Sequence, residues 1–103
     1  MNNNKQDRIA LIDVRERDEL SEVHMVSNNP NITIYNIPMS MLPHYIKFIE
    51  EIANDHDKTY LVCRAGKRSL SMKKKYFSNN PKIESYEGGI FQVKKFNNIF
   101  LLM

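Results

Sequence analysis

The single cysteine of the 103-residue chain, Cys63, ends an apolar run and precedes a short cationic segment. The local sequence is YLVCRAGKRSL, so the cationic side chains of Arg64, Lys67 and Arg68 follow closely. Nearby cations and helix N-termini lower the pKa of a cysteine thiol from about 8.5 into a range of about 3.5–7.5. We therefore expect Cys63 to be a thiolate at neutral pH and to attack an anionic electrophile.

A cysteine that follows an apolar run is usually a small, buried, chemically inert residue of the core. The residues after Cys63 favour a different role. A tight loop between a strand and a helix directs its backbone N–H groups inward, where they and the helix dipole bind an anion. Gly66 suits such a loop, because its backbone can curl without a Cβ in the way. The segment predicts an anion-binding loop that contains a nucleophile.

The elements that must position this loop alternate between β-like and helix-like segments. Predicted strands cover residues 8–14, 32–37, 58–63 and 82–86. Predicted helices cover residues 16–24 (at most two turns), 40–54, 90–96 and a segment from near Ser69 to before Pro81, and 26–31 reads as a loop. Alternating strands and helices predict an α/β fold with a mostly parallel sheet, in which ligands bind beyond the carboxyl ends of the strands.

Length and composition indicate one domain over residues 1–103, with residues 1–7 as a flexible N-terminus. One cysteine cannot form an internal disulfide, and neither a signal peptide nor a membrane span is evident, so we expect a cytoplasmic protein. The net charge is +3, and residues 63–75 carry six cations and no acid, which favours anionic ligands. We expect the apolar residues 99–103 to pack on the core, with a dimer contact as the alternative.

Cys63 to Ser69 resembles the active-site loop of rhodanese-like sulfurtransferases, C-R-x-G-x-R-S. Three further segments resemble that family in the same order: DVRE at 13–16, NIP at 36–38 and EGGI at 87–90. The resemblance implies a three-layer α/β/α sandwich with a small, mostly parallel sheet.

The resemblance also implies an activity, thiosulfate sulfurtransferase. A sulfane sulfur would move from thiosulfate or a similar anionic donor to cyanide or a thiol, including a protein thiol, through a persulfide on Cys63. The implied substrate-binding residues are Arg64, Ala65, Gly66, Lys67, Arg68 and Ser69. Among these, Arg64 and Lys67 would receive the donor, and Arg68 would close the loop by binding backbone or a carboxylate. Asp13 and Arg15 would support the site as an ion pair.

Several alternatives remain open at this point. The domain could be a non-catalytic sulfur carrier or partner-binding module, or Cys63 could be a redox-sensing thiol. A phosphatase or arsenate reductase of the same fold would have five residues between cysteine and arginine, whereas four separate Cys63 from Arg68. We expect no cofactor, no metal site, no nucleic-acid partner and no membrane partner. Without a second cysteine, a persulfide must pass to an external acceptor.

Overall fold

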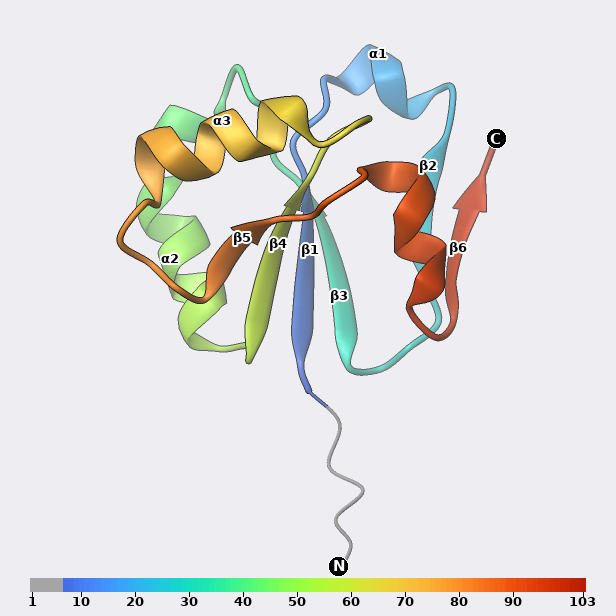
Figure 1. The fold of residues 1–103 in the computed structure, drawn as a ribbon. Helices are drawn as coiled ribbons and strands as arrows, with labels where there is room; N and C mark the ends of the chain where they lie inside the picture. Colours follow the sequence, from blue (N-terminus) through green and yellow to red (C-terminus); the bar gives the residue numbers. More distant parts are fainter. Residues whose placement is uncertain (1–6) are drawn as a thin grey trace, which may run out of the picture.

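The computed structural model describes residues 7–103 and centres on a four-stranded parallel sheet (Figure 1). Its strands are β1 (Ile9–Asp13), β3 (Ile32–Asn36), β4 (Lys58–Val62) and β5 (Ile83–Ser85), in the order β3-β1-β4-β5. The four predicted strands are therefore confirmed, each within a residue or two of its predicted ends. A second, antiparallel pair is formed by β2 (His24–Ser27) and β6 (Ile99–Leu102).

The helices connect these strands. The α-helices are α1 (Arg17–Leu20), α2 (Ile46–Asn54) and α3 (Lys67–Tyr76), and the 3-10 helices are η1 (Leu42–His44) and η2 (Ile90–Lys95). None of the helices within residues 7–103 is long and apolar enough to cross a bilayer.

Strand register brings three chain segments to one edge of the sheet. Asp13 at the end of β1 is paired with Asn36 on one side and with Val62 on the other. Because all the strands are parallel, the residues that follow them emerge together at this edge, where ligands bind in open α/β sheets. Cys63 and Arg15 are thereby placed beyond the carboxyl ends of neighbouring strands.

Successive side chains along the strands point to opposite faces of the sheet and belong to two separate apolar clusters. Ala10, Ile12 and Leu61 pack with residues of α2 and α3 on one face. Leu11 and Val62 pack on the other face, with residues of η2 and of the β2–β6 pair. Figure 1 shows the same arrangement, with α2 and α3 on one side of the sheet and η2 and β6 on the other. The predicted three-layer α/β fold is confirmed, although η2 and the β2–β6 pair, rather than α-helices, cover the second face.

Three expectations about local structure are corrected. The predicted helix over 40–54 is divided: η1 and α2 are separate because the turn at Met41–Tyr45 contains Pro43, and α-helix begins only at Ile46. Helix α3 begins at Lys67, two residues earlier than expected. The helix predicted over 16–24 is shorter: α1 has only four residues, and strand β2 begins at His24. The short helix predicted over 90–96 is confirmed as the 3-10 helix η2.

The apolar C-terminal segment packs as a strand. Ile99 is buried in the second cluster, and β6 pairs residue by residue with β2, for example Leu101 with Met25. The predicted flexible N-terminus falls, apart from Asp7, outside the described residues.

Thr59 in β4 gives the first testable prediction. Its side chain is fully buried, and its Oγ1 has no hydrogen-bond partner among the described residues. Since a buried hydroxyl without a partner costs about 1–3 kcal/mol, Thr59→Val should raise the free energy of unfolding by about 1 kcal/mol. Thr33 is an exposed threonine on β3, and both threonines pair with Ala10. The control Thr33→Val should change stability by less than about 0.5 kcal/mol. Equal effects in chemical denaturation would contradict this explanation.

Candidate active site

The loop after β4 directs its backbone toward the sulfur of Cys63. The Gly66 N–H donates to Sγ over 3.0 Å, and the Ser69 N–H donates over 3.4 Å. The Ser69 hydroxyl lies 3.3 Å from the same sulfur. Cys63 is only 1% exposed. Its side chain belongs to the first apolar cluster, and N–H and hydroxyl groups of the loop contact its sulfur. The sulfur is therefore held in a polar ring, as an anionic sulfur requires.

The pKa of the Cys63 thiol is lowered from its ordinary value. Burial acts in the opposite direction, because it disfavours the thiolate. Hydrogen bonds from the Ser69 hydroxyl and from the N–H groups of Ser69, Gly66 and Ala65 outweigh burial and lower the pKa. The sequence indicates three causes: cations, the helix N-terminus and inward-facing N–H groups; in the structure the hydrogen bonds of the loop lower the pKa.

The hydroxyl of Ser85 contacts the hydroxyl of Ser69. The Oγ atoms of Ser69 and Ser85 are 2.6 Å apart, and Ser85 ends the neighbouring strand β5. When Cys63 is a thiolate, the Ser69 hydroxyl can donate to the sulfur while it accepts a hydrogen bond from the Ser85 hydroxyl. The two serines then form a chain of donors that points at Sγ. Sequence reasoning missed Ser85, because nothing local marks a strand-end serine as a partner of the loop.

This chain of donors predicts that Ser85→Ala raises the pKa of Cys63. Without Ser85, the Ser69 hydroxyl loses a donor that orients it and can turn toward the Gly66 carbonyl, which lies 3.3 Å away. The second-order rate of Cys63 alkylation by iodoacetamide should therefore reach half its maximum at higher pH than in the wild type. Ser69→Ala should move this midpoint further, because it removes the hydroxyl that touches the sulfur.

The exposed Ser71 on α3 provides a matched control. Ser71→Ala should leave the pH profile of alkylation unchanged. An unshifted profile for Ser85→Ala would mean that Ser85 does not orient the Ser69 hydroxyl.

Glycines allow the loop to fit against the segment that follows β5. Gly66 has φ +100°, which side-chain-bearing residues rarely adopt, so the expectation that a glycine is needed here is confirmed. Gly89 has φ +77°, and a Cβ built on it would lie 2.1 Å from the Arg64 carbonyl oxygen. The adjacent Ile90 N–H donates to the Cys63 carbonyl over 2.8 Å. The Gly89 backbone therefore packs directly on the back of the cysteine loop.

Arg68 anchors the loop to α1. Its Nη1 and Nη2 atoms donate to the two carboxylate oxygens of Glu19 over 2.7 and 2.8 Å. Glu19 also accepts the Glu16 N–H in a capping box at the start of α1. The side-chain hydrogen bond from Arg68 lowers the pKa of Glu19 from 4.5 to about 2. A carboxylate is one of the two kinds of partner that the resemblance implies for Arg68.

The lowered pKa of Glu19 predicts how this contact responds to pH. A depressed folded-state pKa contributes stability above the unfolded pKa, here 4.5, and this contribution disappears as the pH falls through about 2. At neutral pH the free energy of unfolding of the wild type should therefore be higher than that of Glu19→Gln. The difference should be only about 1 kcal/mol, because the Arg68–Glu19 pair is partly exposed to solvent. The difference should shrink only below about pH 5 in denaturation experiments. A difference that falls between pH 8 and 6 would contradict this assignment.

Asp13 and Arg15 form a buried ion pair beside the loop. Arg15 Nη2 lies 2.9 Å from Asp13 Oδ2, and both side chains are almost completely buried. Arg15 also donates to the carbonyl oxygens of Glu19 and Val23, so it fixes the chain on either side of the end of α1. The Asn36 amide donates to the Asp13 carbonyl over 2.9 Å and joins β3 to the same network. This network positions Glu19, and through it Arg68.

The remaining cations of the loop face solvent. Arg64 pairs with Glu22 over 3.2 Å, and its guanidinium carbon lies 5.7 Å from the centre of the Phe91 ring. A pocket of about 340 Å³ lies beside the loop and is lined by Ala65, Gly66, Lys67, Leu70, Ser85, Glu87 and Gly88. The side chains of Arg64 and Lys67 are exposed, so both are available to an anion that approaches the loop from solvent. Within residues 7–103 no group of three or more His, Cys, Asp or Glu side chains could hold a metal ion.

Comparisons with known proteins agree with this fold. The sequence model of one family, the Rhodanese-like domain, matches residues 1–96. No curated protein sequence gives a significant match. Among solved structures, the chain is similar to the N-terminal domain of a Clostridium difficile 630 protein described as ATP/GTP-binding, with a TM-score of 0.62 and 21% identity. The alignment covers 89% of this chain and 91% of that domain, and at this identity it supports the fold alone.

Proposed function

Because this chain belongs to the rhodanese-like domain family, we propose that it is a sulfurtransferase that carries sulfur as a persulfide on Cys63 and takes it from thiosulfate or a similar anionic donor. The observation that carries this proposal is the ring of donors around one sulfur: the Gly66 and Ser69 N–H groups and the Ser69 hydroxyl lie within 3.4 Å of Sγ. Such a ring stabilises a thiolate before the reaction and an anionic persulfide after it.

In the first half-reaction, the Cys63 thiolate attacks the outer sulfur of thiosulfate. A bond forms between Sγ and that sulfur, the sulfur–sulfur bond of thiosulfate breaks, and its electron pair leaves with sulfite. The products are an anionic persulfide on Cys63 and sulfite, so atoms and charge balance. Lys67 and Arg64 receive the donor and the leaving sulfite. Arg64 can exchange Glu22 for this anion at low cost, since an exposed ion pair stabilises by only about 0–1 kcal/mol.

In the second half-reaction, an external acceptor removes the outer sulfur. Cyanide attacks it and leaves as thiocyanate, while the electron pair of the broken bond returns to Cys63 as thiolate. The number of residues between Cys63 and Arg68, four, supports sulfur transfer over phosphate or arsenate chemistry, because the shorter ring leaves room for a single sulfur atom. The lack of a second cysteine supports release to an outside acceptor and a cytoplasmic location.

Steady-state kinetics with thiosulfate and cyanide test this function. The wild type should form thiocyanate over many turnovers, whereas Cys63→Ser should not. A sulfur carrier would instead load with sulfur but turn over poorly with thiosulfate and cyanide. Hydrolysis of an aryl phosphate in place of thiocyanate formation would contradict the proposal in favour of phosphatase chemistry.

A further inference from the structure

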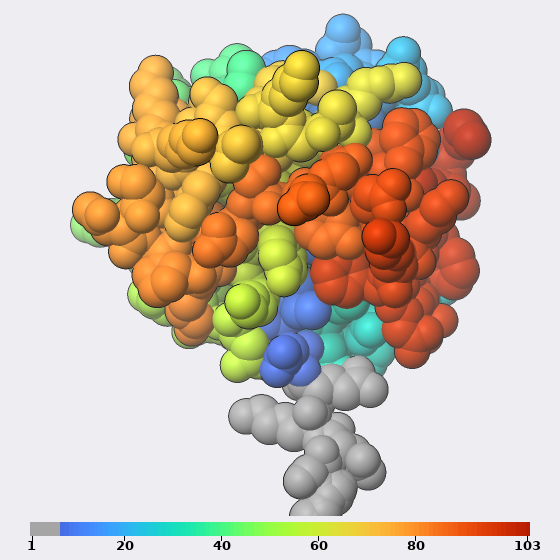
Figure 2. All heavy atoms as spheres, in the orientation of Figure 1, coloured from blue at the N-terminus to red at the C-terminus, as the bar shows by residue number. Residues whose placement is uncertain are grey.

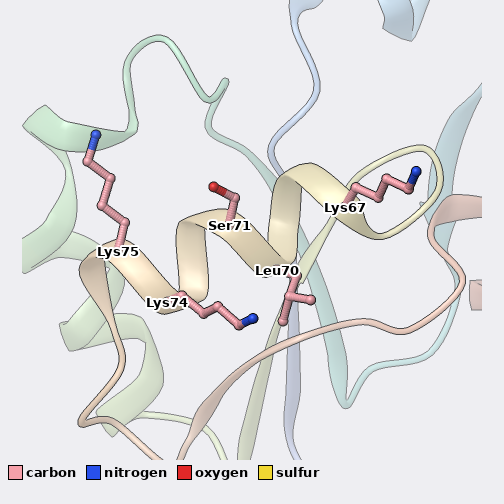
Figure 3. A pocket seen from close by; sticks show the side chains of 5 residues that line it. All are labelled: Lys67, Leu70, Ser71, Lys74 and Lys75. Atoms are coloured by element: carbon pink, nitrogen blue, oxygen red, sulfur yellow. The ribbon is translucent and has the colours of Figure 1, made fainter.

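The outer surface of helix α3 forms an open pocket next to the cysteine loop. Five residues line it, and we call them the α3 face: Lys67, Leu70, Ser71, Lys74 and Lys75. Its volume is about 570 Å³. Figure 3 shows Lys67 at the end of the helix that adjoins the loop and Lys74 and Lys75 in the last turns. In Figure 2, α3 (yellow to light orange) lies on the open surface of the molecule.

The positive charge of this face is not balanced within the described chain. No acid occurs in the sequence from Arg64 to Ile83. The ion pairs formed within residues 7–103 include none of the α3 lysines. Lys74 and Lys75 near the C-terminal end are favoured by the helix dipole, but Lys67 is the first residue of α3, where the dipole favours an acid. Helix stability therefore does not explain Lys67, whereas binding of an anionic group does.

The face combines this charge with an apolar side chain and extends to the site. Leu70 is 45% exposed and lies between the lysines. Lys67 and Leu70 also line the smaller pocket beside the loop, together with Ser85 and Glu87. An exposed leucine among lysines suits a protein surface better than a nucleic-acid backbone, and the carboxylate of Glu87 disfavours a polyanion at the inner end. The α3 face thus has the composition of a docking surface for an acidic protein.

We propose that the α3 face binds the physiological sulfur acceptor, a protein whose receiving thiol is surrounded by acidic residues. The inference rests on the proposed function. The docked acceptor thiol passes its proton to the outer sulfur of the anionic Cys63 persulfide, and the resulting acceptor thiolate attacks that sulfur. A bond forms between the two sulfurs, the bond to Sγ breaks, and its electron pair returns to Cys63. The acceptor's proton ends on the transferred sulfur, so that thiol and anionic persulfide become an acceptor persulfide and the Cys63 thiolate.

Single-turnover transfer to model peptides tests this proposal. The full chain is first loaded with thiosulfate and freed of excess donor, and intact mass confirms the loading. It then reacts with a short peptide whose single cysteine is flanked by aspartate and glutamate, or with a peptide of the same length flanked by serine and glycine. The acidic peptide should accept sulfur about five- to tenfold faster at low salt, and high salt should remove most of this advantage. Rates are compared as a function of thiolate concentration, because flanking charge changes the peptide's own pKa.

Two charge-reversal variants locate the effect. Lys74→Glu/Lys75→Glu should abolish the preference for the acidic peptide while turnover with cyanide stays unchanged. Lys94→Glu/Lys95→Glu makes the same change in net charge at two exposed lysines of η2 and should retain the preference.

The outcomes separate the two proposals. Failure of Cys63 to load would overturn the proposed function and this inference together. Successful loading followed by equal rates for the two peptides, or equal losses in the two variants, would overturn the inference alone. Inhibition of transfer by an RNA duplex, without any preference for the acidic peptide, would assign the α3 face to nucleic acid. A concentration-dependent dimer abolished only by Lys74→Glu/Lys75→Glu would assign it to a second copy of this chain.

Discussion

Gly89→Ala is expected to lower the rate of thiocyanate formation by at least about 100-fold, since a displacement of about 1 Å at a reacting group has an effect of this size. A Cβ at this position would lie 2.1 Å from the Arg64 carbonyl oxygen and 2.7 Å from the Cys63 carbonyl oxygen. Both are backbone atoms of the cysteine loop, so the clash cannot be relieved by rotation of a side chain. The loop must move away from β5, and the donors that converge on Sγ move with it.

Gly88→Ala is the matched control for this prediction. Gly88 also has a positive φ, +88°, but the three atoms nearest to a Cβ there all belong to the flexible side chain of Gln92, the first at 2.6 Å. Its backbone strain is therefore similar, while its effect on the loop should be much smaller. Circular dichroism establishes that both variants fold. Equal losses of activity would indicate that strain in the turn, rather than contact with the loop, determines the effect.

Asp13→Asn should lower the free energy of unfolding by about 3–5 kcal/mol, the usual effect of removing one member of a buried ion pair. The Arg15 guanidinium is fully buried and donates hydrogen bonds to the Asp13 carboxylate, from Nη2 over 2.9 Å and from Nε over 3.0 and 3.3 Å. Asparagine leaves this positive charge buried without a counter-charge. Because small domains are stable by only about 5–15 kcal/mol, the variant should unfold at markedly lower denaturant concentration.

Glu22→Gln removes an ion pair that is exposed instead of buried and should change stability by less than about 1 kcal/mol. A double variant, Asp13→Asn with Arg15→Met, should recover part of the loss, because it also removes the unpaired charge. A cost for Asp13→Asn no larger than that of Glu22→Gln would show that the buried pair does not support the site.

Local sequence was sufficient to predict the four strands of the parallel sheet and the position of Cys63 directly after one of them. The run that forms β1 is apolar on both alternating faces, as a buried parallel strand requires. The run that forms β4 ends in Leu61 and Val62, and Cys63 follows it directly. Gly66 could be predicted because a tight loop before a helix needs a positive φ. These features depend on neighbours in the chain.

Contacts between distant segments could not be predicted in this way. Ser85 matters only because β5 lies beside β4, and Gly89 only because its turn packs on the loop. Glu19 belongs to a charged segment whose pattern does not indicate which carboxylate will reach Arg68. The β2–β6 pair joins opposite ends of the chain, and β2 is four residues long, too short for a distinctive alternating pattern. Which hydrogen bonds lower the Cys63 pKa could not be predicted, because hydrogen-bond geometry around Sγ is a property of the folded loop.

The central claim is that the ring of loop donors holds Cys63 as a thiolate able to take one sulfur atom. Intact-mass spectrometry after treatment with thiosulfate tests it most directly. We expect the wild type to gain the mass of a single sulfur atom, to lose it again on addition of cyanide, and Cys63→Ser to gain none. A wild-type protein that gains no sulfur between mildly acidic and alkaline pH, or a Cys63→Ser variant that gains as much as the wild type, would contradict the claim.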